Sequence, residues 1–71
     1  MKKNKYMIEI PTENGPSQFT YTAQNMKEAE KEVRYYLNIP KNVVIKVYRI
    51  GFDGNYYYDL KTGRRFSSYY D

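Results

Sequence analysis

The sequence predicts an α+β fold: an antiparallel β-sheet of four to five strands, in ββαβββ order, with one α-helix packed on one face. Three observations support this. Apolar residues first alternate around an Asn-Gly turn, then recur at helical spacing, and finally a β-branched run leads into tyrosine-rich segments separated by turns. A chain of 71 residues is the size of one small domain. Its predicted parts are a hairpin at 5–23, a helix at 25–38 and a C-terminal β-meander at 42–70.

The first hairpin is predicted from alternation on both sides of a turn. In residues 5–10 the apolar face carries Tyr6, Ile8 and Ile10. Asn14-Gly15 suits the positive φ angles of a tight turn. The segment 18–23 then resumes the alternation, with threonines on the side that faces solvent.

The helix is predicted from apolar residues at steps of three and four. These are Met26, Ala29, Val33, Tyr36 and Leu37. Asn25 is suited to cap the first turn, with Glu28 three residues later completing a capping box. Asn38 suits the left-handed residue that ends a helix, and Pro40 prevents the helix from resuming.

The C-terminal part begins with residues 42–50, which are apolar on both faces and are predicted to form a central strand. Turns at Asp53-Gly54 and at Gly63 then separate the segment YYYDL from a last strand, RRFSSYY. Because the helix must cross one face of the sheet, the predicted spatial order of strands is 2-1-3-4-5. The predicted core consists of Ile8, Ile10, Phe19, Tyr21, Met26, Ala29, Val33, Leu37, Val43, Ile45 and Val47.

The composition argues against catalysis. The chain has no cysteine and no histidine, which removes disulfides, thiol nucleophiles, Ser-His dyads and the usual zinc sites. Asp53 and Asp59 lie in predicted turns, where a carboxylate ordinarily accepts hydrogen bonds from the backbone. We expect no catalytic residue, no metal ligands and no cofactor, so the protein is not expected to be an enzyme.

The net charge of +4 is concentrated in the second half of the chain. From residue 38 onward the acidic residues are Asp53, Asp59 and Asp71, against twice as many basic ones: Lys41, Lys46, Arg49, Lys61, Arg64 and Arg65. This excess mildly attracts anionic partners. No signal peptide and no membrane-spanning segment is recognised, and cysteine is absent, so the expected location is the cytoplasm, with no membrane partner.

Tyrosine and arginine gather in residues 54–70. Strand propensity and the need to cover a thin sheet explain any single tyrosine. Together, the two residue types are typical of interface hot spots, and rings beside arginine also stack on bases. We expect the helix-free face of the sheet to bind a partner through Tyr48, Tyr57, Arg65, Tyr69, Lys46 and Arg64. Which face of the last hairpin is exposed stays open, because a one-residue slip exchanges its two faces.

Three functions are compatible with such a surface. The leading hypothesis is a small binding protein that acts as an inhibitor or adaptor of a host protein or protein–nucleic-acid complex, for example a defence nuclease. The abundance of lysine, asparagine, isoleucine and tyrosine is typical of small proteins from bacteriophages and mobile elements. The second hypothesis is direct binding of DNA or RNA through the same face. The third is a homodimer formed along an edge strand.

Overall fold

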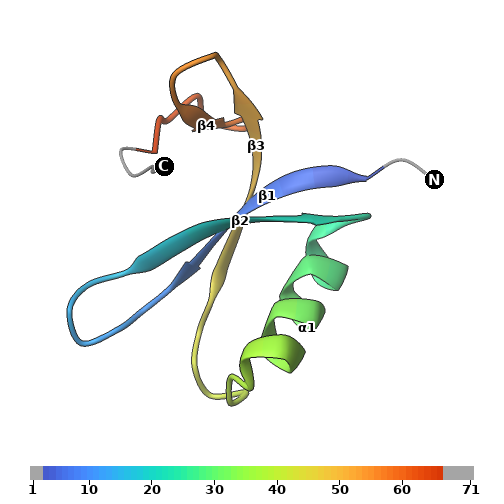
Figure 1. The fold of residues 1–71 in the computed structure, drawn as a ribbon, viewed down its shortest axis with the longest axis vertical. Coiled ribbons are helices and arrows are strands. Elements are labelled where there is room, and N and C mark those ends of the chain that lie inside the picture. Colours follow the sequence, from blue (N-terminus) through green and yellow to red (C-terminus); the bar gives the residue numbers. More distant parts are fainter. Residues whose placement is uncertain (1–2, 67–71) are drawn as a thin grey trace.

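The computed structural model describes residues 3–66, which form one helix and a four-stranded antiparallel sheet (Figure 1). The elements in chain order are β1 (Asn4–Ile10), β2 (Ser17–Ala23), α1 (Met26–Leu37), β3 (Lys46–Phe52) and β4 (Tyr57–Asp59). The strands lie in the order β2-β1-β3-β4. The predicted α+β class and the predicted order of the first four strands are confirmed.

The β1–β2 hairpin follows the predicted alternation. Its register places Tyr6 opposite Tyr21 and Ile8 opposite Phe19, so apolar side chains pair on the face that receives the helix. In the connecting turn, the Gly15 N–H donates to the Thr12 carbonyl at 3.1 Å. Gly15 has a φ of 106°, which glycine adopts without the steric cost that a Cβ would bring.

The helix begins and ends at the predicted caps. The Asn25 side chain accepts a hydrogen bond from the Glu28 N–H at 2.8 Å, and Glu28 in turn accepts one from the Gln24 N–H at 3.1 Å. Asn38 has φ 59° and ψ 45°, the left-handed conformation that ends the helix. Within residues 3–66, the 12-residue α1 is the helix to consider for a membrane span, and it is too short and too polar for one.

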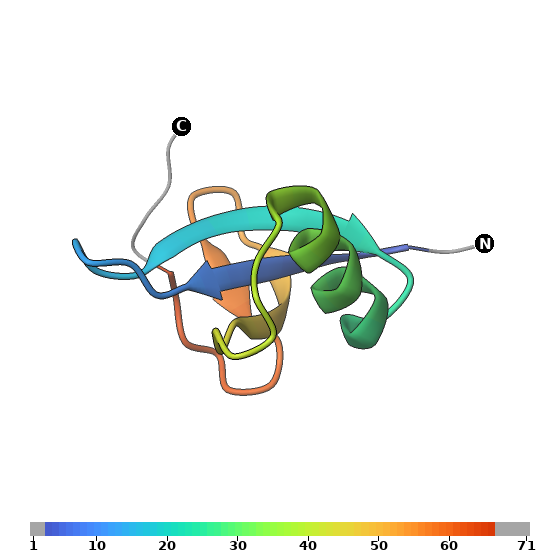
Figure 2. The ribbon, with the colours of Figure 1, turned by 90° about the horizontal axis from the view of Figure 1, so that it is seen from below.

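A first core lies between α1 and the sheet. Its buried members are Tyr6, Ile8, Ala23, Ala29, Val33 and Ile45. The prediction that Met26 and Leu37 belong to this core is wrong, since they are 46% and 54% exposed. Met26 and Leu37 are the first and last residues of α1, which runs across the direction of β1 and β2 rather than along it (Figure 2).

A second, smaller core lies on the opposite face of β1. It consists of Met7, Ile50 and Phe66, with 2%, 5% and 1% of their surface exposed. β3 pairs with β1 only as far as the Tyr6–Arg49 pair, and it then turns away to pair with β4. The segment that follows brings Phe66 back over Met7, on the side of the β1–β2 hairpin away from α1 (Figures 1 and 2).

The helix-free face is therefore less open than predicted. The sequence led us to expect one covered face, whereas three consecutive residues of β1, on alternating faces, are almost fully buried. The prediction of a free face is wrong at its centre, because the chain covers Met7 with its own C-terminal hairpin.

The strands of the C-terminal part are shorter than predicted. β3 begins at Lys46 rather than at residue 42, because the preceding residues form a turn in which the Val43 N–H donates to the Pro40 carbonyl at 3.1 Å. The predicted fifth strand is represented, within the described residues, by one bridge between Tyr58 and Arg65. The rest of the predicted strand lies outside the described residues.

Candidate binding surface

The Tyr58–Arg65 bridge assigns the faces of the C-terminal hairpin. Cross-strand partners lie on the same face, so Arg65 shares a face with Tyr58 and, by alternation, with Tyr56. The side chains agree, because the Arg65 guanidinium carbon lies 5.6 Å from the centre of the Tyr56 ring. The expectation that Tyr57 and Arg65 form one surface is wrong: they lie on opposite faces.

We name the face that points away from the second core the outer hairpin face. It consists of Tyr56, Tyr58, Leu60 and Arg65. Gly51 forms its floor, since a Cβ at this position would lie 2.8 Å from Cζ of Tyr58 and 3.2 Å from Cδ2 of Leu60. Because Gly51 has no side chain, the Tyr58 ring and Leu60 lie directly against β3.

The outer hairpin face is accessible to a partner. Tyr56 and Leu60 are 40% and 49% exposed, and the Arg65 side chain is 67% exposed. Arg65 Nε lies 3.8 Å from Oδ2 of Asp53, an exposed pair that contributes little to stability. Large apolar surface and an exposed guanidinium group thus lie side by side on a short hairpin.

The other face of the hairpin is used inside the protein. Tyr48 and Tyr57 pack against the second core and are half-buried. The Tyr48 ring centre lies 5.3 Å from that of Phe66, and the Tyr57 ring centre lies 4.8 Å from that of Phe52. These two predicted binding residues therefore help to close the fold and offer only their outer edges to solvent.

The remaining predicted residues lie in three places. Arg64 is exposed and places its guanidinium carbon 5.3 Å from the centre of the Phe66 ring, which it covers from outside. Lys46 lies at the far end of β3, opposite Glu9 of β1. Tyr69 lies outside the described residues. The predicted set is thus divided between the second core, the outer hairpin face and the start of β3.

The described hairpin carries three basic and two acidic side chains, and both carboxylates accept hydrogen bonds from the backbone. Oδ1 of Asp53 accepts hydrogen bonds from the N–H groups of Tyr56, at 2.7 Å, and Asn55, at 2.8 Å, and these bonds lower the pKa of Asp53. Asp59 is 8% exposed, and its Oδ1 accepts from the Lys61 N–H at 2.8 Å. The basic side chains of the same hairpin, in contrast, are exposed: Lys61, Arg64 and Arg65.

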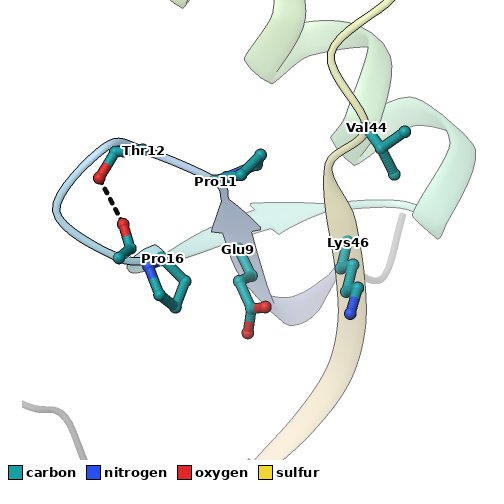
Figure 3. Close-up of a pocket in the computed structure, with 7 residues that line it drawn as sticks. Glu9, Pro11, Thr12, Pro16, Val44 and Lys46 are labelled. Carbon is teal, nitrogen blue, oxygen red and sulfur yellow. Dashed lines mark hydrogen bonds between the residues drawn. The ribbon is translucent and has the colours of Figure 1, made fainter.

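A shallow depression of about 360 Å³ lies at the opposite end of β3 (Figure 3). Its apolar wall comes from Pro11, Pro16 and Val44, and Glu9 and Lys46 extend along its lower side. Oε1 of Glu9 is already held by the Gln18 amide at 2.9 Å. Within residues 3–66 no group of three acidic, histidine or cysteine side chains is arranged to hold a metal ion.

The sequence contained a signal for the outer hairpin face that we did not use. Gly51 interrupts a strand pattern, and such a glycine often marks the close approach of another group. The residues that approach it, Tyr58 and Leu60, are two of the three outer-face residues missing from the predicted set, and Tyr56 is the third.

Comparison of the chain with protein-family models, curated proteins and solved structures found no match. The functional proposal therefore depends on the geometry and chemistry of the chain itself.

Proposed function

We propose that the protein is a non-catalytic binding protein that occupies the surface of a protein partner with its outer hairpin face. The observation that supports this is the exposure of Tyr56, Leu60 and Arg65 beside one another, on a hairpin whose carboxylates are bound to its own backbone. Tyrosine and arginine dominate interface hot spots because each combines a large contact area with directed hydrogen bonds.

The chemistry of this face specifies a partner surface with an apolar centre and an acidic rim. Tyr56 and Leu60 offer the apolar contact, and Arg65 sits at its border with Lys61 and Arg64 nearby in the chain. The Arg65–Asp53 pair is long and solvent-exposed, so a carboxylate of the partner can replace Asp53 at little cost. A bidentate contact with that carboxylate would add both affinity and orientation.

Occupation of a surface is the mode of action that fits this chain, which carries neither histidine nor cysteine. It corresponds to an inhibitor or adaptor that covers a functional surface of a larger host protein. A defence nuclease is one such target, because its nucleic-acid-binding groove presents catalytic carboxylates. The composition typical of phage and mobile-element proteins supports this setting.

Direct binding of nucleic acid is the second candidate, favoured by a specific feature of the hairpin. The three cation–ring contacts among the described residues all involve a ring of this hairpin: Lys5 with Tyr57, Arg64 with Phe66 and Arg65 with Tyr56. Rings stack on bases and cations contact phosphates, so the exposed Arg65–Tyr56 pair also suits a single strand, whereas the Phe66 ring is buried.

The test is capture of a partner from bacterial lysate, with and without nuclease, by the native protein and by the double variant Tyr56→Ala, Arg65→Ala. Tyr35→Ala is the matched control, since Tyr35 is a tyrosine of the helix and is 78% exposed. We expect a protein that survives nuclease, is retained by the control and is lost with the double variant. Equal retention by both variants would contradict the proposal.

The salt dependence of the captured complex separates the two candidates. Binding of a single strand through about three phosphate contacts weakens roughly 20-fold when salt rises from about 50 to 200 mM, because counterions are released. An interface centred on tyrosine changes little over the same range. A captured species that disappears with nuclease and binds with a steep salt slope would replace the first candidate by the second.

A further inference from the structure

The strand β2 forms an edge of the sheet. Among the described residues it pairs with β1 alone, so along seven residues one side of its backbone has no strand partner. Figure 1 shows β2 crossing in front of β1. An edge of this length is a template for the addition of another strand.

This edge has none of the usual features that prevent strand addition. Between Ser17 and Ala23 there is no lysine, arginine, aspartate, glutamate or proline. Its register with β1 continues without interruption from the Ile10–Ser17 pair to the Asn4–Ala23 pair, so no bulge twists it away. Natural proteins commonly blunt an exposed edge by one of these means, and β2 uses none of them.

We propose that the partner of this edge is the β2 strand of a second copy of the protein, paired antiparallel about a two-fold axis at Thr20. This register pairs Phe19 of each copy with Tyr21 of the other, and Gln18 of each copy with Thr22 of the other. A two-fold interface requires a surface that complements itself. β2 meets this requirement on both faces.

On the face that carries α1, the pairing joins aromatic rings. Phe19 and Tyr21 are only half-buried at the border of the first core. The Tyr21 hydroxyl donates to Oε1 of Glu32 at 2.5 Å, which fixes the orientation of its ring. The two-fold axis thus creates two identical Phe–Tyr cross-strand pairs, and aromatic pairs of this kind stabilise antiparallel strands.

On the other face, the pairing brings opposite charges into one row. Glu9 lies beside Gln18 in the β1–β2 register and accepts its amide hydrogen bond, whereas Lys5 lies beside Thr22. Across the two-fold axis, the side chains on this face therefore follow one another from strand to strand in a fixed order. Glu9 and Gln18 of one copy come first, and Thr22 and Lys5 of the other copy come next. Neighbouring positions hold no like charges, and the Gln18 amide oxygen has a hydroxyl donor opposite it.

The resulting dimer contains eight strands, and each C-terminal hairpin lies over Met7 of its own copy. The outer hairpin face of each copy points away from that second core, and so away from the extended sheet. The dimer is independent of the proposed function, but it would present two binding faces and so strengthen binding to a partner with two equivalent sites.

Sedimentation equilibrium tests this interface with two variants of opposite charge, Thr20→Lys and Thr20→Glu. Thr20 is exposed and lies on the axis, so each variant places two like charges directly opposite one another. We expect the native mass to rise from monomer to dimer between about 1 µM and 1 mM. Each variant alone is expected to raise the dissociation constant roughly tenfold or more.

A one-to-one mixture of the two variants is expected to restore the dimer, because lysine then faces glutamate. Thr62→Lys is the matched control, since it adds the same charge in an exposed turn far from β2 and should dimerise like the native chain. A native chain that remains monomeric at the highest concentration would overturn the proposal. So would a Thr20→Lys variant that dimerises like the control, or a mixture that stays monomeric.

Hydrogen exchange of the native chain gives a second readout that does not depend on how the variants fold. The amides of Ser17–Ala23 that point away from β1 are expected to exchange more slowly at high protein concentration. Protection that is the same at every concentration would overturn the proposal, as would protection that appears only after a different protein is added.

Discussion

The second core depends on a single ring, so Phe66→Ala is the most informative perturbation of the fold. Phe66 is 1% exposed and packs against Met7, Ile50 and the ring of Tyr48. Loss of a buried phenyl ring costs about 3–5 kcal/mol, including the cavity that remains. This core is small and lies under a hairpin that can partly collapse, so we expect a value near the lower limit, about 3 kcal/mol.

That loss is a large part of the total stability. At about 0.05–0.15 kcal/mol per residue, a chain of 71 residues has an unfolding free energy of about 4–11 kcal/mol. The variant is therefore expected to be partly unfolded at room temperature if the native protein lies near the lower limit. Phe66→Leu, which keeps most of the apolar volume, is expected to cost about 1 kcal/mol.

Urea unfolding followed by circular dichroism measures these differences. Phe52→Ala is the matched control, because Phe52 is a phenylalanine of the same hairpin but is 57% exposed. We expect it to cost less than about 1 kcal/mol. Equal losses for Phe66→Ala and Phe52→Ala would refute the conclusion that the C-terminal hairpin seals the second face of β1.

Three further predictions concern the hairpin and the edge of the helix. Gly51→Ala should destabilise the protein by about 1–2 kcal/mol, because the new Cβ displaces the Tyr58 ring. A double-mutant cycle should show that the same substitution lowers the unfolding free energy much less in a Tyr58→Ala background. Hydrogen bonds from the backbone lower the pKa of Asp53 below its ordinary value of 3.8. The loss of unfolding free energy in Asp53→Asn should therefore be largest at neutral pH and should shrink as the pH falls below 3.8. Urea titrations at several pH values measure this loss. The hydrogen bond to Glu32 is the main cause that raises the pKa of Tyr21 to about 12. Ultraviolet titration of the folded protein should therefore show late ionisation of Tyr21, which Glu32→Ala returns toward 10.

The parts of the fold that were predicted correctly depend on interactions between residues close in the sequence. Asn25 and Asn38 cap the helix through bonds that span a few residues, and Asn14-Gly15 lies in the predicted turn between β1 and β2. Alternation alone assigned Ile8 and Met7 to opposite faces of β1. Rules of this kind require no knowledge of what lies across the sheet.

The errors concern features that distant segments determine. Met26 and Leu37 are exposed at the two ends of α1, which runs across the direction of β1 and β2, and helical periodicity carries no information about that direction. Met7 is covered because β3 leaves β1 after Arg49, so that the chain returns to the free face. Neither the crossing of α1 nor the departure of β3 is indicated by residues close in the sequence to the side chains whose exposure it determines.

The residue types of the candidate surface were predicted from the sequence, but the pairing of the strands that carry them was not. The sequence indicated correctly that tyrosine and arginine gather in the C-terminal hairpin, yet the binding face depended on whether Tyr57 or Tyr58 lies opposite Arg65. One residue in the turn decides this, and both arrangements have similar local propensities. Gly51 beneath Tyr58 accounts for the register of β4 on β3, but the turn that follows β4 determines which tyrosine lies opposite Arg65.

The burial of both faces of β1 also affects how the protein folds while it is being synthesised on the ribosome. β1 is made early, but its partner β3 and its cover Phe66 are among the last described residues to be synthesised. A nascent chain that ends after α1 can close the first hairpin and dock the helix, yet Met7 and the β3-pairing edge of β1 are still exposed. The second core can therefore form only after Phe66 has been synthesised, and Met7 stays exposed until then.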